Sequence, residues 1–476
     1  MFEKWLDEPN ENCSGDFVFI YATNQQIRKV FILNCIAIDG KIMKPTIMTF
    51  VAVVIVVALV GVGVYLVVSA PTTPATATTT TTPATTTTPT PTQYIKIGSN
   101  TALNHAYCVE CTQGQTLAVE DINAEGGLHI GDQNYLLQFI SYDGRMLNDE
   151  SVANVRRLLE VDGVRDLVFL GPSSCTMAAM PYVQEFIAET GEDIVLMASG
   201  TGTTDLCVNY GSSIAFRERP TGYETGKMHT RFVIETYGPK FGVLISNDAN
   251  GLDEVRGIQE SAARYGGQIV SIEYYQYGEV NVTSQLTKLM DLQPTTIIIA
   301  HHPTYTVDFA KQAFNLGAKE KGIHIHILGD APLAQVTTTI GVERAEGLTC
   351  EIPSAYPVYL QEGVPEVVAF AEKIEERFGM PIGGGHPCGY TAVMILGKAM
   401  EIAGTTDVTA VKSVLRNMKI SDVEDELWFK INPLSPVDAA GHIYNAIGQG
   451  SSQYTVAIFH NVDGTLEQVP LQALEA

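Results

Sequence analysis

Small hydroxylated residues that follow an apolar run near residue 170 form the first group with recognisable chemistry. Residues 166–170 are typical of a buried strand, and the chain then breaks at Gly171-Pro172 and continues as Ser173-Ser174 before a helical pattern begins. Backbone N–H groups at a helix N-terminus, together with hydroxyls, can hold a carboxylate or another hydrogen-bond acceptor. Ser173 and Ser174 are therefore candidate ligand-binding residues.

A second polar loop, residues 199–204, follows an expected strand at 194–198. Its sequence Ser-Gly-Thr-Gly-Thr-Thr superficially resembles a dinucleotide-binding glycine pattern. The third glycine is replaced by Asp205, however, and this carboxylate would repel a pyrophosphate. A polar-ligand loop and a simple turn are the interpretations that remain. Under the first of these, Ser199 and Thr201 are candidate ligand-binding residues.

A carboxylate, Asp330, stands at the end of another expected strand, residues 323–328. In this position it can face a cleft and pair with a ligand ammonium group; the alternative is an aspartate that caps the next helix. Charge-assisted hydrogen bonds contribute roughly 1.5–3 kcal/mol each. One such acid with hydroxyls opposite could support micromolar binding, which corresponds to about −8 kcal/mol.

Histidines occur in two places that could matter for a metal. His301-His302 opens the loop after an expected strand, while His324 and His326 alternate along a strand and point the same way. No third ligand has an obvious spacing, so ordinary sheet histidines are favoured over zinc. Patterns typical of a catalytic nucleophile, base or metal set are also absent from the sequence, which predicts neither an enzyme nor a cofactor.

The elements that must position these loops follow from the hydrophobic period, which changes repeatedly between 2 and 3.6 after residue 94. Strands and helices alternate in two series, one up to about residue 198 and one from 221 to 328. The first series includes helices expected to begin at Gly114 and Met177, and the second includes a helix expected to begin at Leu252 and a strand expected at residues 296–300. Two such series predict an α/β fold with two parallel-sheet lobes. In such sheets ligands bind beyond the carboxyl ends of the strands. The informative loops are therefore 171–176, 199–205, 246–251, 301–305 and 329–332.

The charge and the N-terminal sequence bound the class of protein. A formal charge of −24 without a basic run argues against nucleic acid as a binding partner.

Residues 50–68 are all apolar or glycine, which favours a transmembrane helix or signal anchor over residues 47–70. Basic residues precede this segment, so the positive-inside rule predicts a single-pass protein of the cell membrane with its later part extracytoplasmic. A cleaved signal peptide is the alternative.

The flanks of this segment are simpler. Residues 71–92 contain only Thr, Pro and Ala and predict an extended stalk that holds a domain off the membrane. Residues 1–46 are expected to be cytoplasmic. A further hypothesis is that translation starts at Met43 or Met48 and that the preceding residues are not made.

Cysteine usage agrees with an oxidising compartment. Six of the eight cysteines follow the stalk, and an even number outside the cell favours disulfides. The predicted pairs are Cys350 with Cys388, and Cys175 with Cys207, the latter because both follow adjacent strands.

Several short motifs, in order along almost the whole outer part, resemble the periplasmic-binding-protein type I family, specifically the branched-chain amino acid (Leu/Ile/Val)-type substrate-binding proteins of ABC importers. They are residues 117–127, Tyr142-Asp143, 171–174, 215–219, 286–289, Gly329-Asp330 and 390–392. The resemblance implies two Rossmann-like lobes that are joined by three crossings and close on a small ligand by a hinge motion. The crossings are expected near Pro220, Ile352 and Trp428. Lobe 1 would comprise residues 93–219 and 353–427, and lobe 2 residues 220–352 and 428–476.

The same resemblance assigns roles to single residues. A hydroxyl of Ser173 or Ser174 and one of Ser199 or Thr201 would hold a ligand carboxylate, and Asp330 of the other lobe would bind the ammonium group. Further expected contacts come from two tyrosines, Tyr107 and Tyr223. Two departures from the family pattern, Asn250 in place of a tyrosine and His302-Pro303 in place of an aromatic residue, make the pocket more polar. His302 joins the candidate ligand-binding residues, and amides, urea-like compounds and polar amino acids stay open as ligands.

The function that follows is capture of a small amino acid or amide-like solute for an ABC transporter permease. The alternative is a ligand-sensing receptor ectodomain that acts through a partner. Neither function involves nucleic acid or a metal.

Overall fold

The computed structural model describes residues 37–38, 41–42, 93–328, 333–352, 356–447, 449, 451–452, 457–462 and 465–468. The chain divides into two compact units, residues 1–88 and 89–476. In the first unit the described residues form one antiparallel pair, β1 (Ala37–Ile38) with β2 (Lys41–Ile42). The predicted membrane segment and stalk, residues 47–92, lie outside the described residues. Within the described part, no helix has both the length and the apolar character needed to cross a bilayer.

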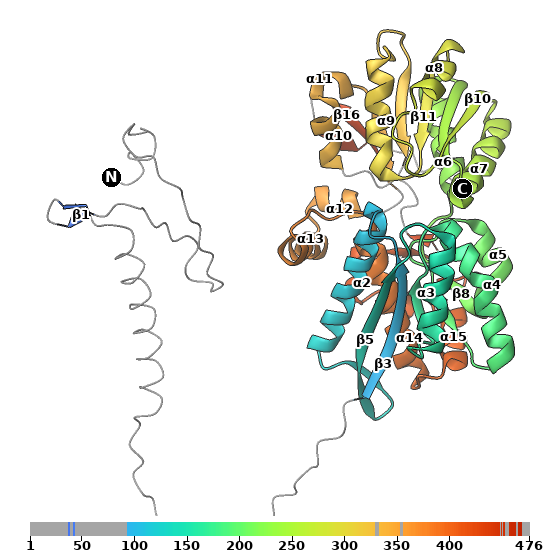
Figure 1. The fold of residues 1–476 in the computed structure, drawn as a ribbon, viewed down its shortest axis with the longest axis vertical. Coiled ribbons are helices and arrows are strands. Elements are labelled where there is room, and N and C mark those ends of the chain that lie inside the picture. Colours follow the sequence, from blue (N-terminus) through green and yellow to red (C-terminus); the bar gives the residue numbers. More distant parts are fainter. Residues whose placement is uncertain are drawn as a thin grey trace, which may run out of the picture. The chain divides into compact units, whose positions relative to one another are not determined.

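The second unit contains two sheets that lie in separate lobes (Figure 1). The first sheet has the order β4-β5-β3-β6-β7-β8, and its strands pair in parallel except for the β4–β5 hairpin. Its strands are β3 (Gln93–Thr101), β4 (Leu128–Ile130), β5 (Gln133–Asp143), β6 (Asp166–Phe169), β7 (Val195–Met197) and β8 (Ala215–Phe216). The helices between and after them are α2 (Ala106–Ala124), α3 (Asn148–Glu160), α4 (Ser173–Thr190), α5 (Thr204–Ile214), α14 (Gly385–Ala403) and α15 (Val408–Asn417).

The second sheet has the order β10-β9-β11-β12-β13-β16-β17, with β16 and β17 antiparallel to their neighbours. Its strands are β9 (Lys240–Ser246), β10 (Gln268–Tyr275), β11 (Thr296–Ala300), β12 (His324–Leu328), β13 (Thr349–Ile352), β16 (Ala457–Val462) and β17 (Thr465–Gln468). The helices of this lobe are α6 (Gly222–Tyr237), α7 (Ala249–Tyr265), α8 (Thr283–Asp291), α9 (Pro303–Asn315), α10 (Leu333–Ile340) and α11 (Val342–Ala345). The prediction of an α/β fold with two parallel-sheet lobes is confirmed.

The chain after the second sheet returns to the first lobe through short elements. They are α12 (Tyr356–Glu362), α13 (Pro365–Phe378), η2 (Ile420–Asp422), α16 (Leu427–Ile431), β14 (Leu434–Ser435) and β15 (Ser451–Ser452). Trp428 and Tyr444 pack in the core of the first sheet, although residues 428–476 were predicted to belong to lobe 2. The last strands, β16 and β17, do join the second sheet. The boundaries at 219, 352 and 427 stay predictions.

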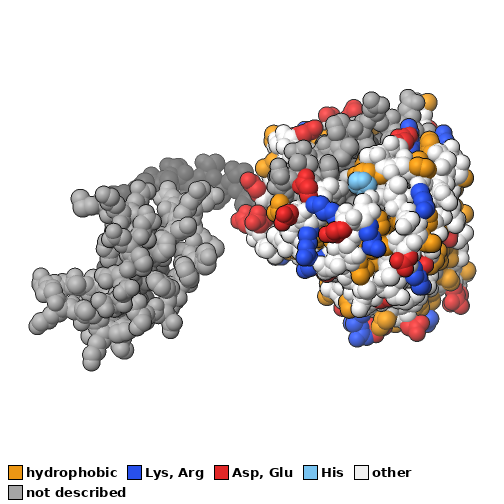
Figure 2. Space-filling view, turned by 90° about the horizontal axis from the view of Figure 1, so that it is seen from above, with side chains coloured by type: hydrophobic (Ala, Val, Ile, Leu, Met, Phe, Trp, Pro, Cys, Tyr) orange, Lys and Arg blue, Asp and Glu red, His pale blue; other side chains and the backbone are white. Residues whose placement is uncertain are grey.

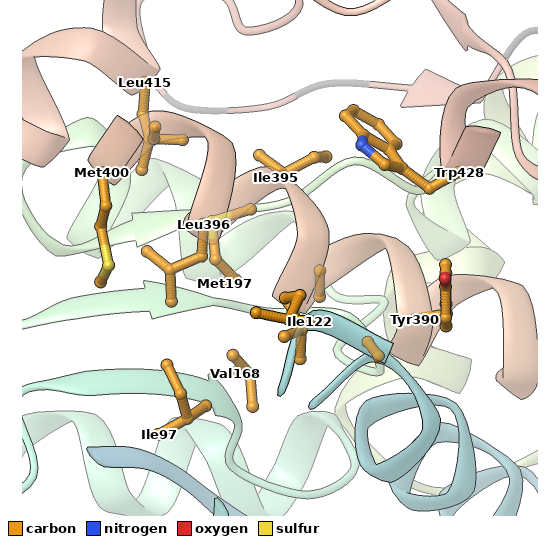
Figure 3. Packing of buried hydrophobic residues seen from close by; sticks show 14 of the residues in the cluster. Ile97, Ile122, Val168, Met197, Tyr390, Ile395, Leu396, Met400, Leu415 and Trp428 are labelled. Atoms are coloured by element: carbon orange, nitrogen blue, oxygen red, sulfur yellow. The ribbon is translucent and has the colours of Figure 1, made fainter. Parts of the chain in front are cut away.

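The central strands are apolar on both faces because helices cover both sides of each sheet. All residues of β6 and β11 are buried. Figure 3 shows how the first core is completed from distant segments: Ile122 of α2, Ile395 and Leu396 of α14, and Trp428 of α16 all belong to one buried cluster. The close packing of α2 on α14 depends on glycine. A Cβ atom at Gly389 would overlap the carbonyl oxygen of Cys111, so the two helix backbones approach where no side chain fits.

Helices start about one to two turns earlier than the apolar period predicts. The helix expected from Gly114 begins at Ala106, the one expected from Met177 begins at Ser173, and the one expected from Leu252 begins at Ala249. Polar or small residues fill the first turns of α4 and α7, and the hydrophobic pattern does not extend into them. The candidate ligand loops are therefore mostly helix N-terminal turns at the carboxyl ends of strands.

Charged side chains are mixed on the surface. On the face that Figure 2 shows, Lys and Arg side chains lie among Asp and Glu and form no continuous basic patch. This arrangement agrees with the exclusion of nucleic acid, which requires concentrated positive charge.

The six cysteines of the outer part are all buried thiols, so the predicted Cys350–Cys388 and Cys175–Cys207 disulfides are wrong. Cys350 lies on β13 of the second sheet, whereas Cys388 lies in the first turn of α14, in the first lobe. Burial raises the pKa of Cys175 and of Cys207, which keeps these thiols protonated and poorly reactive.

Reduction is therefore expected to leave the stability of the protein unchanged. Loss of a native disulfide typically costs about 2–5 kcal/mol. The midpoint of thermal unfolding, followed by circular dichroism with and without a reducing agent, should coincide. A clearly lower midpoint in the reduced sample would show that bridges exist.

Candidate ligand-binding site

An internal cavity of about 60 Å³ lies between the two lobes. The first lobe contributes His105, Tyr107 and Ser173, and Arg219 lies at the crossing between the lobes. The second lobe contributes Thr221, Thr225, Asn250, Glu254, His301 and His302. Most of these residues stand at or near the first turns of α2, α4, α6, α7 and α9. Helix N-termini from both lobes thus converge on one space, and their free N–H groups favour hydrogen-bond acceptors.

A larger cavity of about 630 Å³ adjoins the inner one and shares Pro172, Ser173, His301 and His302 with it. Its wall also includes Ser174, Asp248 and Tyr277. The inner cavity is large enough for a few water molecules only. Together the two cavities form one cleft, with a narrow inner chamber and a wide outer one.

Direct hydrogen bonds between the lobes keep the cleft narrow. The backbone N–H of Ala249 donates to Ser174 Oγ at 3.2 Å, and the hydroxyl of Tyr277 donates to the carbonyl of Asn104 at 3.0 Å. The lobes are therefore closed on each other in this structure.

A guanidinium group forms part of the inner wall. Arg219 Nη1 donates to the hydroxyl of Tyr107 at 2.9 Å, and the guanidinium carbon lies 5.1 Å from the centre of the tyrosine ring. Such a cation–π contact, combined with a hydrogen bond, fixes the direction of the guanidinium. The inner chamber thus contains a positioned positive charge.

A buried carboxyl group forms another part. Glu254 and His229 are both fully buried, with Oε1 and Nε2 3.3 Å apart. Burial raises the pKa of Glu254 well above its ordinary value, and the nearby Asp248 and Asp253 raise it further. Burial lowers the pKa of His229. Both shifts favour the neutral forms, and a protonated Glu254 can donate a hydrogen bond into the cavity rather than repel an anion.

A chain of side chains crosses the cleft next to the inner chamber. His105 Nδ1 lies 3.5 Å from Cys108 Sγ, and His105 Nε2 lies 2.9 Å from Nδ1 of His302. On its other side, His302 Nε2 lies 2.7 Å from Asp248 Oδ2. Burial, followed by the neighbouring His302 and His301, lowers the pKa of His105 to about 3. The pKa of Asp248 is also lowered: burial acts to raise it, but His301, His302 and the N–H of Gly251 favour the carboxylate.

The two histidines in the second lobe have an unusual backbone conformation. Both His301 (φ 69°) and His302 (φ 56°) lie in the left-handed region, which is uncommon for residues other than glycine. The hydroxyl of Tyr275 donates to the carbonyl of Ala300 at 3.0 Å and also contacts the carbonyl of His301. Such conformations persist only where the surroundings enforce them, and they are frequent in binding sites.

The predicted hydroxyl donors are distributed unevenly. Ser173 lines both cavities, but its Oγ already accepts the N–H groups of Gly202 and Thr203 at 3.0 and 3.1 Å. Ser174 lines the outer cavity only. Ser199 and Thr201 are fully buried and are not among the residues that line either cavity. Ser199 Oγ donates to the carbonyl of Val168 at 3.0 Å, so it stabilises its own loop.

Of the other predicted site residues, some line a cavity and others do not. Tyr107 and His302 line the inner cavity. Tyr223 lies in the first turn of α6 with its hydroxyl on Glu260, away from both cavities. Asp330 lies outside the described residues. The roles of all eight residues as ligand contacts stay predictions.

Several cavity residues were not predicted from the sequence, above all Arg219, Thr225 and Glu254. A usable signal existed for two of them. Thr225 follows Thr221, and Glu254 follows Asn250, by four residues, which places each pair on one helix face. A polar i, i+4 pair that begins at a strand's carboxyl end indicates a wall of the cleft.

The sequence profile of a family described as periplasmic binding protein matches residues 97–433, more than half of the chain. The chain belongs to the periplasmic binding protein family. Membership confirms the resemblance that the motifs indicated, and since its relatives are binding proteins, this periplasmic binding protein is not an enzyme.

Individual relatives are distant. The chain is 23% identical over 306 residues to the leucine-, isoleucine-, valine-, threonine- and alanine-binding protein of Pseudomonas aeruginosa, which covers 64% of this chain and 76% of that protein. It is 22% identical over 324 residues to Leu/Ile/Val-binding protein homolog 8 of Brucella abortus, with 66% and 77% covered.

Solved structures agree with the fold. A leucine binding protein from Thermotoga maritima superposes with a TM-score of 0.61 at 18% identity, covering 79% of this chain and 97% of that one. A solute binding protein of an ABC transporter from Rhodopseudomonas palustris, in complex with 3,4-dihydroxy benzoic acid, gives 0.64 at 18% identity, covering 79% and 96%. At this identity the likeness shows the fold of this periplasmic binding protein, not its ligand.

Proposed function

We propose that this periplasmic binding protein captures a small amino acid or amide-like solute in the cleft between its lobes and delivers it to an ABC transporter permease. The observation that carries the proposal is the donor-rich inner chamber. Arg219, the buried acid Glu254, whose raised pKa favours the protonated form, and the amide of Asn250 all line it. Donors of this kind complement the oxygen atoms of a carboxylate or an amide carbonyl.

The bound state would require a hinge motion. The inner chamber of about 60 Å³ is smaller than the pockets that hold drug-sized ligands, which are about 300–1,000 Å³. A solute would enter while the lobes are apart and would then be enclosed, as the bonds of Ser174 and Tyr277 between the lobes form again. Asp330 is proposed as the partner of a solute ammonium group.

The cellular setting is part of the same proposal. Residues 47–70 would anchor the protein in the cell membrane and residues 71–92 would hold the binding unit outside it. The relatives named above are amino acid-binding proteins or belong to ABC transporters, which supports a permease as the partner. Genes for a permease and an ATPase beside this gene would favour import over sensing through another protein.

A thermal-shift screen of the full-length protein against amino acids, amides, urea and short peptides tests solute capture. A true ligand at 100 times its dissociation constant should stabilise the folded state by about 2.7 kcal/mol. Calorimetry of each stabilising compound would then give the stoichiometry, which is expected to be one per chain. Absence of any stabiliser among these classes would contradict the proposed solute type.

A further inference from the structure

We propose that Asp248, His301 and His302 bind a divalent transition-metal ion of the zinc class at the junction of the two cavities. Each residue offers one ligand atom, and the three atoms lie within 4.8 Å of one another. His302 Nε2 is 2.7 Å from Asp248 Oδ2, and His301 Nε2 is 3.9 Å from Asp248 Oδ1. Ligands about 2.0–2.1 Å from a tetrahedral ion are roughly 3.4 Å apart, so small side-chain rotations bring the set together.

The ligand atoms are held by the fold rather than by a flexible loop. Asp248 follows β9 and the histidines follow β11, and these strands are neighbours in the sheet, with Ala300 opposite Ile245. Asp248 Oδ1 accepts the N–H groups of Asn250 and Gly251 at 3.0 and 2.9 Å as the N-cap of α7. The left-handed backbone conformation of the two histidines fixes the positions of their rings. A metal at this place would replace the proton between His302 and Asp248.

The hydrogen-bond partner behind one ligand comes from the other lobe. When His302 binds a metal through Nε2, its Nδ1–H can donate to His105 Nε2, 2.9 Å away in the first lobe. Histidine ligands usually have such a second partner, which fixes ring orientation. Metal binding would therefore strengthen the contact between the lobes at the edge of the inner chamber.

The donor set selects the class of ion. Two imidazoles and one carboxylate suit Zn²⁺, Co²⁺, Ni²⁺ or Fe²⁺, whereas Ca²⁺ and Mg²⁺ prefer oxygen ligands only. Three protein ligands leave a position for water or for a solute donor. Because His301 and His302 line both cavities, this open position is within the cleft. No other group of three such side chains occurs among the residues that the structure describes.

The test uses the full-length protein, stripped with a chelator and desalted, without solute. Titration with Zn²⁺ by calorimetry is expected to show one ion per chain, and Co²⁺ should give the visible absorption of a histidine-ligated site. Asp248→Asn, His301→Asn and His302→Asn should each weaken Zn²⁺ binding more strongly than His105→Gln, for which roughly a 10–100-fold loss is expected.

The substitutions are chosen to keep the fold. Asparagine caps a helix as well as aspartate does, and it tolerates the left-handed backbone at 301 and 302 better than most residues. Equal unfolding midpoints of the variants in the presence of chelator would verify folding. His442→Asn is the matched control, because His442 Nδ1 is 2.8 Å from Asp438 Oδ2 in a pair without a third ligand; it should bind Zn²⁺ like the wild type.

The proposal does not depend on the solute, since the metal alone is titrated. Wild-type protein that binds no stoichiometric ion would overturn it. Unchanged affinity in all three asparagine variants would overturn it as well, by showing that the ion binds elsewhere.

Discussion

Replacing Arg219 by glutamine is expected to weaken solute binding by about 100-fold or more. The guanidinium is positioned on the wall of the inner chamber by Tyr107, where it can donate two hydrogen bonds to a carboxylate or amide oxygen. Charge-assisted hydrogen bonds contribute about 1.5–3 kcal/mol each, and about 1.4 kcal/mol corresponds to a factor of ten. Calorimetric titration of the variant with the best stabilising solute measures the loss.

A conservative and a remote substitution make this result specific. Arg219→Lys keeps the charge but not the planar fork of donors, so an intermediate loss is expected. Arg416→Gln is the control, because Arg416 is exposed, donates to the carbonyl of Ser212 and lines neither cavity. Full affinity in Arg219→Gln would show that the guanidinium does not bind the solute.

Replacing Gly389 by alanine is expected to destabilise the first lobe by about 3 kcal/mol or more. The new Cβ would overlap the backbone carbonyl of Cys111 on α2, and a backbone cannot move aside as a side-chain tip can. The substitution therefore forces α14 and α2 apart, although alanine by itself favours a helix by about 1 kcal/mol over glycine. A lower midpoint of thermal unfolding, measured by circular dichroism, is the expected result.

Gly397 offers the matched control on the same helix. A Cβ there would lie 2.9 Å from Cδ2 of Leu128, the end of a side chain that can rotate. Gly397→Ala should therefore cost much less than Gly389→Ala. Equal stability of Gly389→Ala and the wild type would mean that the two helices are packed less closely than described.

The fold could largely be predicted from the sequence because the hydrophobic periodicity of its strands and helices is strong. The strand expected at residues 296–300 is β11 with the same bounds, since five buried residues in a row leave no other periodicity. Helix beginnings were less accessible. Residues such as Ser173 and Ala249 start helices through free N–H groups and capping, and neither feature has a hydrophobic period.

The cleft was predicted in place but only in part in its residues. Its position follows from the carboxyl ends of parallel strands, and the loops at 171–176 and 301–305 indeed meet there. Glu254 was missed because a glutamate within a helix normally faces solvent, although its spacing of four residues from Asn250 places both on one helix face. Tertiary packing buries this acid beside His229, and burial raises its pKa.

The disulfide prediction shows the limit of compositional reasoning. Six cysteines are an even number, but Cys350 and Cys388 belong to different lobes, and pairing requires Cα atoms within about 7 Å. The predicted lobe boundaries already placed Cys350 in lobe 2 and Cys388 in lobe 1, so this pair conflicted with the predicted domain organisation. The Thr/Pro stalk and the apolar segment before it are read from composition alone, and they stay predictions.

A crystal structure of the full-length protein with its best stabilising solute tests solute capture between the lobes most directly. The expected result is one solute molecule in the inner chamber, with an oxygen atom within hydrogen-bond distance of Arg219 and further contacts to Asn250 or Glu254. A solute bound outside the cleft, or an inner chamber that stays empty at saturating concentration, would contradict the proposed function.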